Sequence, residues 1–108
     1  MSLPGALASP LYDPLREWLG NLPSDRIPDP GEFNALLHAA VLSGGGVPIR
    51  FVRPDVARVR TYADQFEVRT YLRGQIPVRE GSAHDAFNAL AWLAFPRTKA
   101  AINRRHFA

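Results

Sequence analysis

The chain has 108 residues, of which 46% are hydrophobic, and it carries a formal net charge of +3 and no cysteine. This length allows one domain with a single modest core, and the lack of cysteine excludes disulfides, zinc–thiolate sites and thiol nucleophiles. No run approaches the ~18 consecutive apolar residues of a membrane span, and the first residues lack the basic and apolar blocks of a secretory signal. We therefore expect one soluble, cytoplasmic domain over residues 1–108.

The charge is unevenly distributed along the chain. Residues 1–49 contain two Arg and five acidic residues, whereas residues 50–79 contain seven Arg and three acidic residues. A basic segment of this kind can bind nucleic acid or an acidic protein. Twelve Arg against one Lys, with abundant Ala, Pro and Gly, is also the composition that a GC-rich bacterial genome produces. The composition therefore favours a bacterial source over a nucleic-acid partner.

The N-terminal third is rich in proline and predicts little regular structure. We expect an extended arm over residues 1–12, because Pro and Gly interrupt helices and strands. A short helix is expected from Pro14 to Leu19, with Asp13 as its N-cap and Gly20 as its stop.

The next segment contains a clear helix start signal. Asp29, Pro30 and Glu32 have the spacing of an N-cap, a first-turn proline and a capping-box acid. The apolar pattern that follows predicts a helix to about Leu42. The glycines at 44–46 close this helix and do not form a phosphate loop, since they follow a helix and precede no Lys-Ser/Thr pair.

The central part predicts a minor β component. Residues 47–52 are β-branched and aromatic, and residues 75–79 are the obvious partner, although Pro48 and Pro77 restrict pairing to edges or strand ends. Between them a helix is expected from Tyr62 to Arg73, capped by Thr61, closed by Gly74 and burying Leu72. The expected fold class is a small α+β domain, mostly α, with four to five helices and a minor extended or β pair.

The C-terminal part predicts two consecutive helices. Ser82 is the expected N-cap of a helix over residues 83–94, and Pro96 ends or kinks this helix and starts a second one to about Arg105. The first of the two is apolar on most sides, so we expect it to be buried on more than one face. Its expected inward residues are Phe87, Leu90, Ala91 and Ala94, widened by Trp92, Leu93 and Phe95.

The placement of several polar residues depends on the geometry at Pro96. If Pro96 makes a hairpin, the start of the first helix lies beside the end of the second, and His84, Asp85, Asn88, Asn103 and His106 converge. If Pro96 only kinks a continuous helix, the 22 residues from His84 to His106 span about 33 Å. No shared site then exists.

The C-terminal half also carries a string of motifs at fixed spacing. They are Phe66-Glu67-Val68-Arg69, Gly74-Gln75-Ile76-Pro77-Val78-Arg79, His84-Asp85-x-Phe87-Asn88-Ala89-Leu90, Trp92-Leu93-x-Phe95-Pro96, Lys99, and Asn103-x-x-His106. This string resembles the signature of a bacterial family known as domain of unknown function 3025. The resemblance covers residues 66–106 and is more specific than any one of the motifs.

The resemblance implies no activity, because the family carries none that is agreed. Its members are longer and continue past the Asn-x-x-His element, so the resemblance implies that this chain is a fragment and that a site could lack groups from the missing part. Two departures are Phe66, where the family tends to have Tyr, and Val78, where it tends to have Thr.

The polar residues of the C-terminal helices form the first functional hypothesis. His84, Asp85, Asn88 and His106 are the candidate catalytic residues, with Arg79 and Asn103 as supporting residues. Two imidazoles and a carboxylate suit a divalent metal that activates water for hydrolysis, and His84 alone suits a general base near neutral pH. The structural alternative is that His84 and Asp85 cap a helix and Asn88 bonds a neighbouring loop. No cofactor or metal is identified.

The second hypothesis is a binding module. The arginines of residues 50–79 would contact an acidic protein or phosphates, and the helix–Pro–helix at 83–106 is a weak match to a helix-turn-helix. A third hypothesis is that the chain is a non-catalytic half of a larger or oligomeric protein and that a partner covers its apolar surface. The arginines of the binding-module hypothesis are Arg50, Arg53, Arg58, Arg60, Arg69 and Arg73.

Overall fold

A computed structural model describes residues 10, 13–23, 25–37, 41–54 and 66–107. These residues form the expected small, mostly helical fold with a minor β pair. The expected arm over residues 1–12 and the Thr61 cap lie outside the described residues, except for Pro10. The elements are α2 (Asp13–Arg16), the 3-10 turn η2 (Leu19–Asn21), α3 (Pro30–Asn34), β1 (Arg50–Val52), α4 (Phe66–Arg73), β2 (Gln75–Pro77), α5 (Ala83–Ala94) and α6 (Pro96–Phe107).

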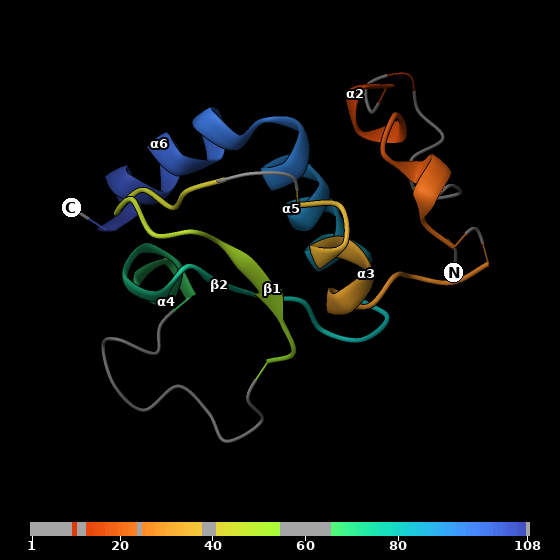
Figure 1. Ribbon diagram of the computed structural model, residues 1–108, viewed down its shortest axis with the longest axis horizontal. Helices are drawn as coiled ribbons and strands as arrows, with labels where there is room; N and C mark the ends of the chain where they lie inside the picture. Colours follow the sequence, from red (N-terminus) through yellow and green to blue (C-terminus); the bar gives the residue numbers. More distant parts are fainter. Residues whose placement is uncertain (1–9, 11–12, 24, 38–40, 55–65, 108) are drawn as a thin grey trace.

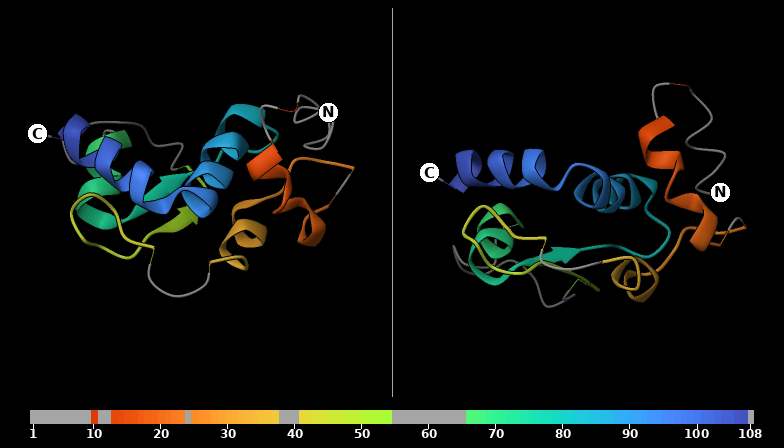
Figure 2. Two further views of the ribbon diagram at one scale, coloured as in Figure 1. Left: turned by 90° about the horizontal axis from the view of Figure 1, so that it is seen from above. Right: turned by 45° about the horizontal axis from the view of Figure 1, so that its top comes forward.

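The elements form two layers. Figure 2 (right) shows α5 and α6 above a lower layer of α4, the two strands and α3, with α2 at one end. None of the described helices combines the length and apolar content needed to cross a membrane. The buried core joins both layers and consists of Leu15, Leu22, Phe33, Leu36, Ile49, Phe51, Ile76, Val78, Ala86, Ala89, Leu90, Trp92 and Leu93.

The two strands pair in parallel, and α4 lies between them in the chain (Figure 1). Phe51 stands opposite Ile76 in the register, and Val52 stands opposite Pro77. The expected pairing of residues 47–52 with residues 75–79 is therefore confirmed over three residues of each strand.

Side chains occupy the outer edges of both strands. On β1, the Asn34 side chain donates to the Phe51 carbonyl and accepts from the Phe51 N–H, both at 2.7 Å. On β2, the Thr70 hydroxyl donates to the Gln75 carbonyl at 3.0 Å, and Pro77 has no N–H to offer. An unpaired strand edge invites pairing with another chain. Side-chain hydrogen bonds and Pro77 therefore limit pairing of both outer edges of this two-stranded sheet with another chain.

Two helices in the first half are shorter than expected. The capping box at Asp29 and Glu32 is confirmed, with hydrogen bonds of 2.9 Å in both directions. However, the prediction that this helix runs to Leu42 is wrong, because the helix ends at Asn34, whose side chain bonds the Phe51 backbone, and Leu42 forms an antiparallel bridge with Pro48. Likewise α2 ends at Arg16, and a separate 3-10 turn follows it.

Helix α4 ends as expected, but one of its expected core residues points outward. Gly74 closes it with a φ of 68°, in the left-handed region that glycine favours. Thr70 is fully buried because its hydroxyl reaches β2, whereas Leu72, two residues later, points away and is 46% exposed. The prediction of a buried Leu72 is therefore wrong.

Helix α5 has the expected bounds and is buried on more than one side. Ser82 caps it, since its hydroxyl accepts from the Asp85 N–H at 3.2 Å. Phe87, Ala91 and Ala94 are only partly buried and Phe95 is exposed. The inward stripe is thus rotated by about one residue from the expected one, and its buried apolar members are Ala86, Ala89, Leu90, Trp92 and Leu93.

The glycine-rich turn at 44–46 packs closely against two helices. A Cβ at Gly44 would lie 2.6 Å from the Arg104 backbone N and 2.8 Å from the Ala100 carbonyl O of α6. A Cβ at Gly45 would lie 2.5 Å from the Tyr71 carbonyl O of α4. These atoms belong to the backbone and cannot rotate away, so both positions require glycine.

We expect Gly44→Ala to lower the free energy of unfolding by about 3 kcal/mol, because the methyl group overpacks a backbone contact. Urea unfolding followed by circular dichroism measures this. Gly20→Ala is the matched control, since no atom lies within 4 Å of the Cβ it would add, and we expect it to change stability by about 0.5 kcal/mol or less. Equal effects of the two substitutions would contradict the packing of this turn against α6.

Candidate functional site

The boundary between α5 and α6 is a single non-helical residue. Phe95 has φ −131° and ψ 59°; its N–H donates to the Ala91 carbonyl at 2.8 Å and its carbonyl accepts from the Lys99 N–H at 3.0 Å. Pro96 is then the first residue of α6, where its missing N–H costs nothing. Figures 1 and 2 show that α6 leaves α5 at a steep angle. The chain is therefore neither one continuous helix nor a tight antiparallel hairpin.

A cavity of about 640 Å³ lies where these helices meet the end of β2. We call it the histidine cavity. Its lining includes all four candidate catalytic residues and Arg79, so the bend brings His84 and His106 to one cavity. The full lining is Pro54, Glu67, Pro77, Arg79, His84, Asp85, Asn88, Lys99, Ile102 and His106.

Asp85 is held by Arg79 in the wall of this cavity. One carboxylate oxygen accepts from the Arg79 backbone N–H at 2.9 Å and from Nε at 2.8 Å, and the other accepts from Nη2 at 3.2 Å. Burial alone would raise the pKa of Asp85, which is 8% exposed, but the hydrogen bonds and charge of Arg79 outweigh burial and hold this pKa below its usual value. Asp85 thus remains ionised and also binds the backbone N–H of Arg79, the second residue after β2.

Asn103 lies behind the cavity, and the cavity lining does not include it. It is 1% exposed, and its side-chain oxygen accepts from the Gly44 N–H at 3.0 Å. Its amide nitrogen donates to the Glu67 carbonyl at 2.9 Å and to the Glu67 carboxylate at 2.7 Å. Asn103 therefore ties α6 to α4 and to the glycine turn, and it fixes the orientation of Glu67 at the cavity.

Lys99 and Glu67 line the cavity although sequence reasoning did not choose them. Lys99 is partly buried, and its Nζ lies 5.8 Å from the centroid of the Trp92 ring. Burial lowers the pKa of Lys99, and the negative charge of Glu67 partly offsets this. The composition of the sequence could have pointed to Lys99, because it is the only lysine in the chain.

The imidazoles of His84 and His106 are exposed. Among the residues that the structure describes, no group of three or more His, Asp or Glu side chains is arranged to hold a metal ion. The described side chains therefore offer proton transfer, hydrogen bonding and charge.

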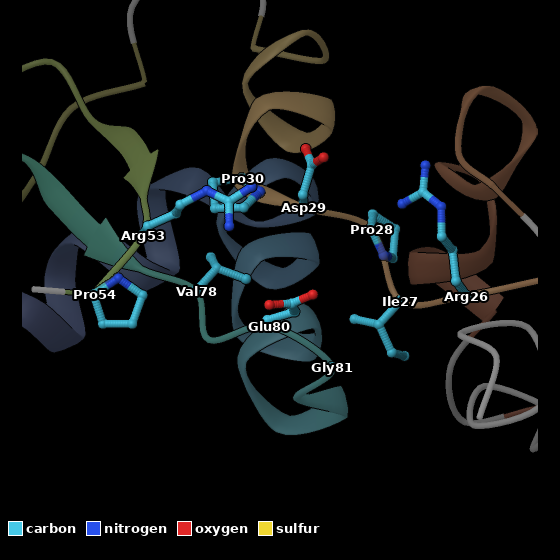
Figure 3. Close-up of a pocket in the computed structure, with 10 residues that line it drawn as sticks. All are labelled: Arg26, Ile27, Pro28, Asp29, Pro30, Arg53, Pro54, Val78, Glu80 and Gly81. Atoms are coloured by element: carbon cyan, nitrogen blue, oxygen red, sulfur yellow. The ribbon is translucent and has the colours of Figure 1, made fainter. Parts of the chain in front are cut away.

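A second cavity, of about 560 Å³, is lined in part by Val78, Glu80 and Gly81 of the segment that follows β2 (Figure 3). We call it the proline cavity. Arg26 and Arg53 lie at opposite sides of it in Figure 3, and Arg26 is bound to Glu32 at 2.6 and 2.9 Å. None of the candidate site residues lines it. Its lining is Arg26, Ile27, Pro28, Asp29, Pro30, Arg53, Pro54, Val78, Glu80 and Gly81.

Only some of the arginines of the binding-module hypothesis are described by the structure. Arg58 and Arg60 lie outside the described residues. Arg69 donates to the Gln75 side chain at 2.6 Å, so its Nε is already used within the fold. The histidine cavity is therefore the better-supported candidate site.

The Arg79–Asp85 contact predicts an acid-dependent loss of stability. A carboxylate whose pKa is lowered in the folded state stabilises that state above its unfolded pKa of about 3.9, and this contribution is lost as pH falls through the folded pKa. We expect Asp85→Asn to cost about 2 kcal/mol at pH 7, and much less at pH 2, in urea unfolding.

The control for this prediction is Asp25→Asn, which changes an exposed aspartate and should have little effect at either pH. If Asp85→Asn destabilised the protein equally at pH 7 and pH 2, the ionised contact would not be the cause.

Comparison with known proteins agrees with the motifs of the C-terminal half. A family model described as Protein of unknown function (DUF3025) matches residues 49–108. No curated protein and no solved structure matches the chain. The matched segment contains every residue that lines the histidine cavity. The chain belongs to the DUF3025 family.

Proposed function

We propose that the histidine cavity is a small-molecule site at which His84 and His106 transfer protons. One observation carries the proposal: polar residues from α4, the end of β2, α5 and α6 line one cavity, and all of them lie in the family-matched segment. A cavity of about 640 Å³ is within the range of ligand pockets, about 300–1,000 Å³.

The imidazoles carry the chemistry in this proposal. Histidine changes its charge between about pH 5 and 8 and is the commonest general acid or base. His84 and His106 come from different helices and are exposed, so one can accept a proton from an attacking water while the other donates to a leaving group. Hydrolysis of a small substrate is the reaction class that such a pair serves.

The neighbouring residues position the ligand. Asn88 is partly buried in the cavity wall, and its amide can donate and accept hydrogen bonds. Asp85 keeps the Arg79 guanidinium in place through its two oxygens. The proposal retains the expectation of a cytoplasmic bacterial protein, which rests on the cysteine-free and arginine-rich composition.

The test is a screen of the purified protein against small esters, amides and phosphate monoesters, followed by His84→Gln and His106→Gln. Loss of general acid–base catalysis costs about 10²–10⁴-fold in rate, and we expect each variant to lose at least about 100-fold in kcat. Arg97→Gln is the control, because Arg97 is exposed on α6 and does not line the cavity. Turnover that survives both histidine substitutions would contradict the assignment.

A further inference from the structure

We infer that the ligand of the histidine cavity carries an oxyanion, a carboxylate or a phosphate group, and that Lys99 is its anchor. This inference rests on the proposed function only in taking the cavity to be a ligand site. It adds the chemical class of the ligand and a residue that the proton-transfer scheme does not use.

The first argument is that both carboxylates of the cavity already accept hydrogen bonds from protein donors. Both oxygens of Asp85 accept from Arg79, and one oxygen of Glu67 accepts from Asn103 at 2.7 Å. A carboxylate oxygen can accept two hydrogen bonds, so one Asp85 oxygen is fully used by Arg79, and a cationic ligand would share the other Asp85 oxygen with Arg79 and Glu67 with Asn103. The negative charge of Asp85 is therefore balanced within the protein by Arg79, which makes the cavity less attractive to a cation.

The second argument is that the donors remain available. The Lys99 ammonium donates no hydrogen bond to a described residue, and it lies over the Trp92 ring and under the influence of the Glu67 charge. Arg79 uses Nε and Nη2 for Asp85, and its Nη1 donates to none of the residues that the structure describes. The Asn88 amide is likewise without a partner in the described structure. A ligand rich in acceptor oxygens fits these groups.

The third argument is the identity of residue 99. Twelve of the thirteen basic residues are Arg, and the single Lys lies in the cavity. Lysine presents a compact point charge with three rotatable donors, whereas arginine presents a rigid planar fork. Partial burial beside the Trp92 ring removes water from this charge, and less hydrated charges bind anions more strongly.

Glu67 is the resident counter-charge of Lys99. The two residues line the same cavity, and the charge of Glu67 acts on the ammonium. Asn103 holds Glu67 from behind at 2.7 Å, so Glu67 competes with an incoming anion from a fixed position. Removing its charge should therefore strengthen anion binding, which is an uncommon effect for a substitution in a binding site.

The single lysine makes the test direct. In protein labelled with ¹³C at lysine Cε, Lys99 gives the only side-chain signal of this type, and it can be followed during titration with inorganic phosphate, acetate or neutral glycerol. We expect saturable shifts with phosphate or acetate and none with glycerol, together with a rise in the measured pKa of Lys99 when the anion binds. The stronger of the two anions distinguishes a phosphate ligand from a carboxylate ligand.

Two variants complete the experiment, with the ring signals of His84 and His106 reporting binding. Lys99→Met should weaken anion binding at least tenfold, since a hydrogen bond to a charged group is worth about 1.5–3 kcal/mol. Glu67→Gln keeps the acceptor for Asn103 but removes the charge, and it should strengthen binding about threefold or more. Heteronuclear NMR spectra of both variants check that they are folded.

The outcomes separate this inference from the proposed function. Linear shifts that follow ionic strength for every salt, or unchanged affinity in Lys99→Met, would overturn the inference and leave the proton-transfer proposal standing. Saturable phosphate binding through Lys99, with turnover that is insensitive to both histidine substitutions, would support the inference and overturn the proton-transfer proposal.

Discussion

The break at Phe95–Pro96 is the constraint on which the rest of the C-terminal half depends. Proline cannot continue α5 because it has no N–H to donate. The Phe95 N–H makes the last hydrogen bond of α5, to the Ala91 carbonyl, and the Phe95 carbonyl accepts the first hydrogen bond of α6, from the Lys99 N–H. The resulting bend lets α6 pack on α4 and leaves space between the helices and the end of β2. A straight helix would have separated the two histidines and left no common cavity.

Three polar side chains, two amides and one carboxylate, link separate elements of this small core through hydrogen bonds. Asn34 closes β1, Asn103 joins α6 to α4 and the glycine turn, and Asp85 joins α5 to the residue after β2. Each satisfies backbone groups that a larger sheet or bundle would pair with more backbone. An unsatisfied buried polar group costs about 1–3 kcal/mol, so loss of any of these three side chains would leave backbone groups unpaired. Asp85 and Asn103 therefore act on the site through Arg79 and Glu67.

Local signals made the helix starts predictable. The Asp29 and Ser82 caps and the Gly74 stop depend on residues within one turn. The early end of α3 was not predictable, because Asn34 finds its partner 17 residues away. The role of Asn103 depends on Glu67 and Gly44, which are 36 and 59 residues away. For the site, the spacing of polar residues along the sequence identified those of α5 and α6. Only the fold shows which carboxylates accept hydrogen bonds from other side chains and that Lys99 lines the same cavity.

The most direct test is the distance between residues 84 and 106 in solution. The chain has no cysteine, so His84→Cys/His106→Cys provides two unique sites for spin labels, and both positions are exposed. Double electron–electron resonance should give a distance distribution centred well below the ~33 Å that a continuous helix requires. A distribution centred near 33 Å would mean that α5 and α6 form one helix in solution, and the histidine cavity would not exist.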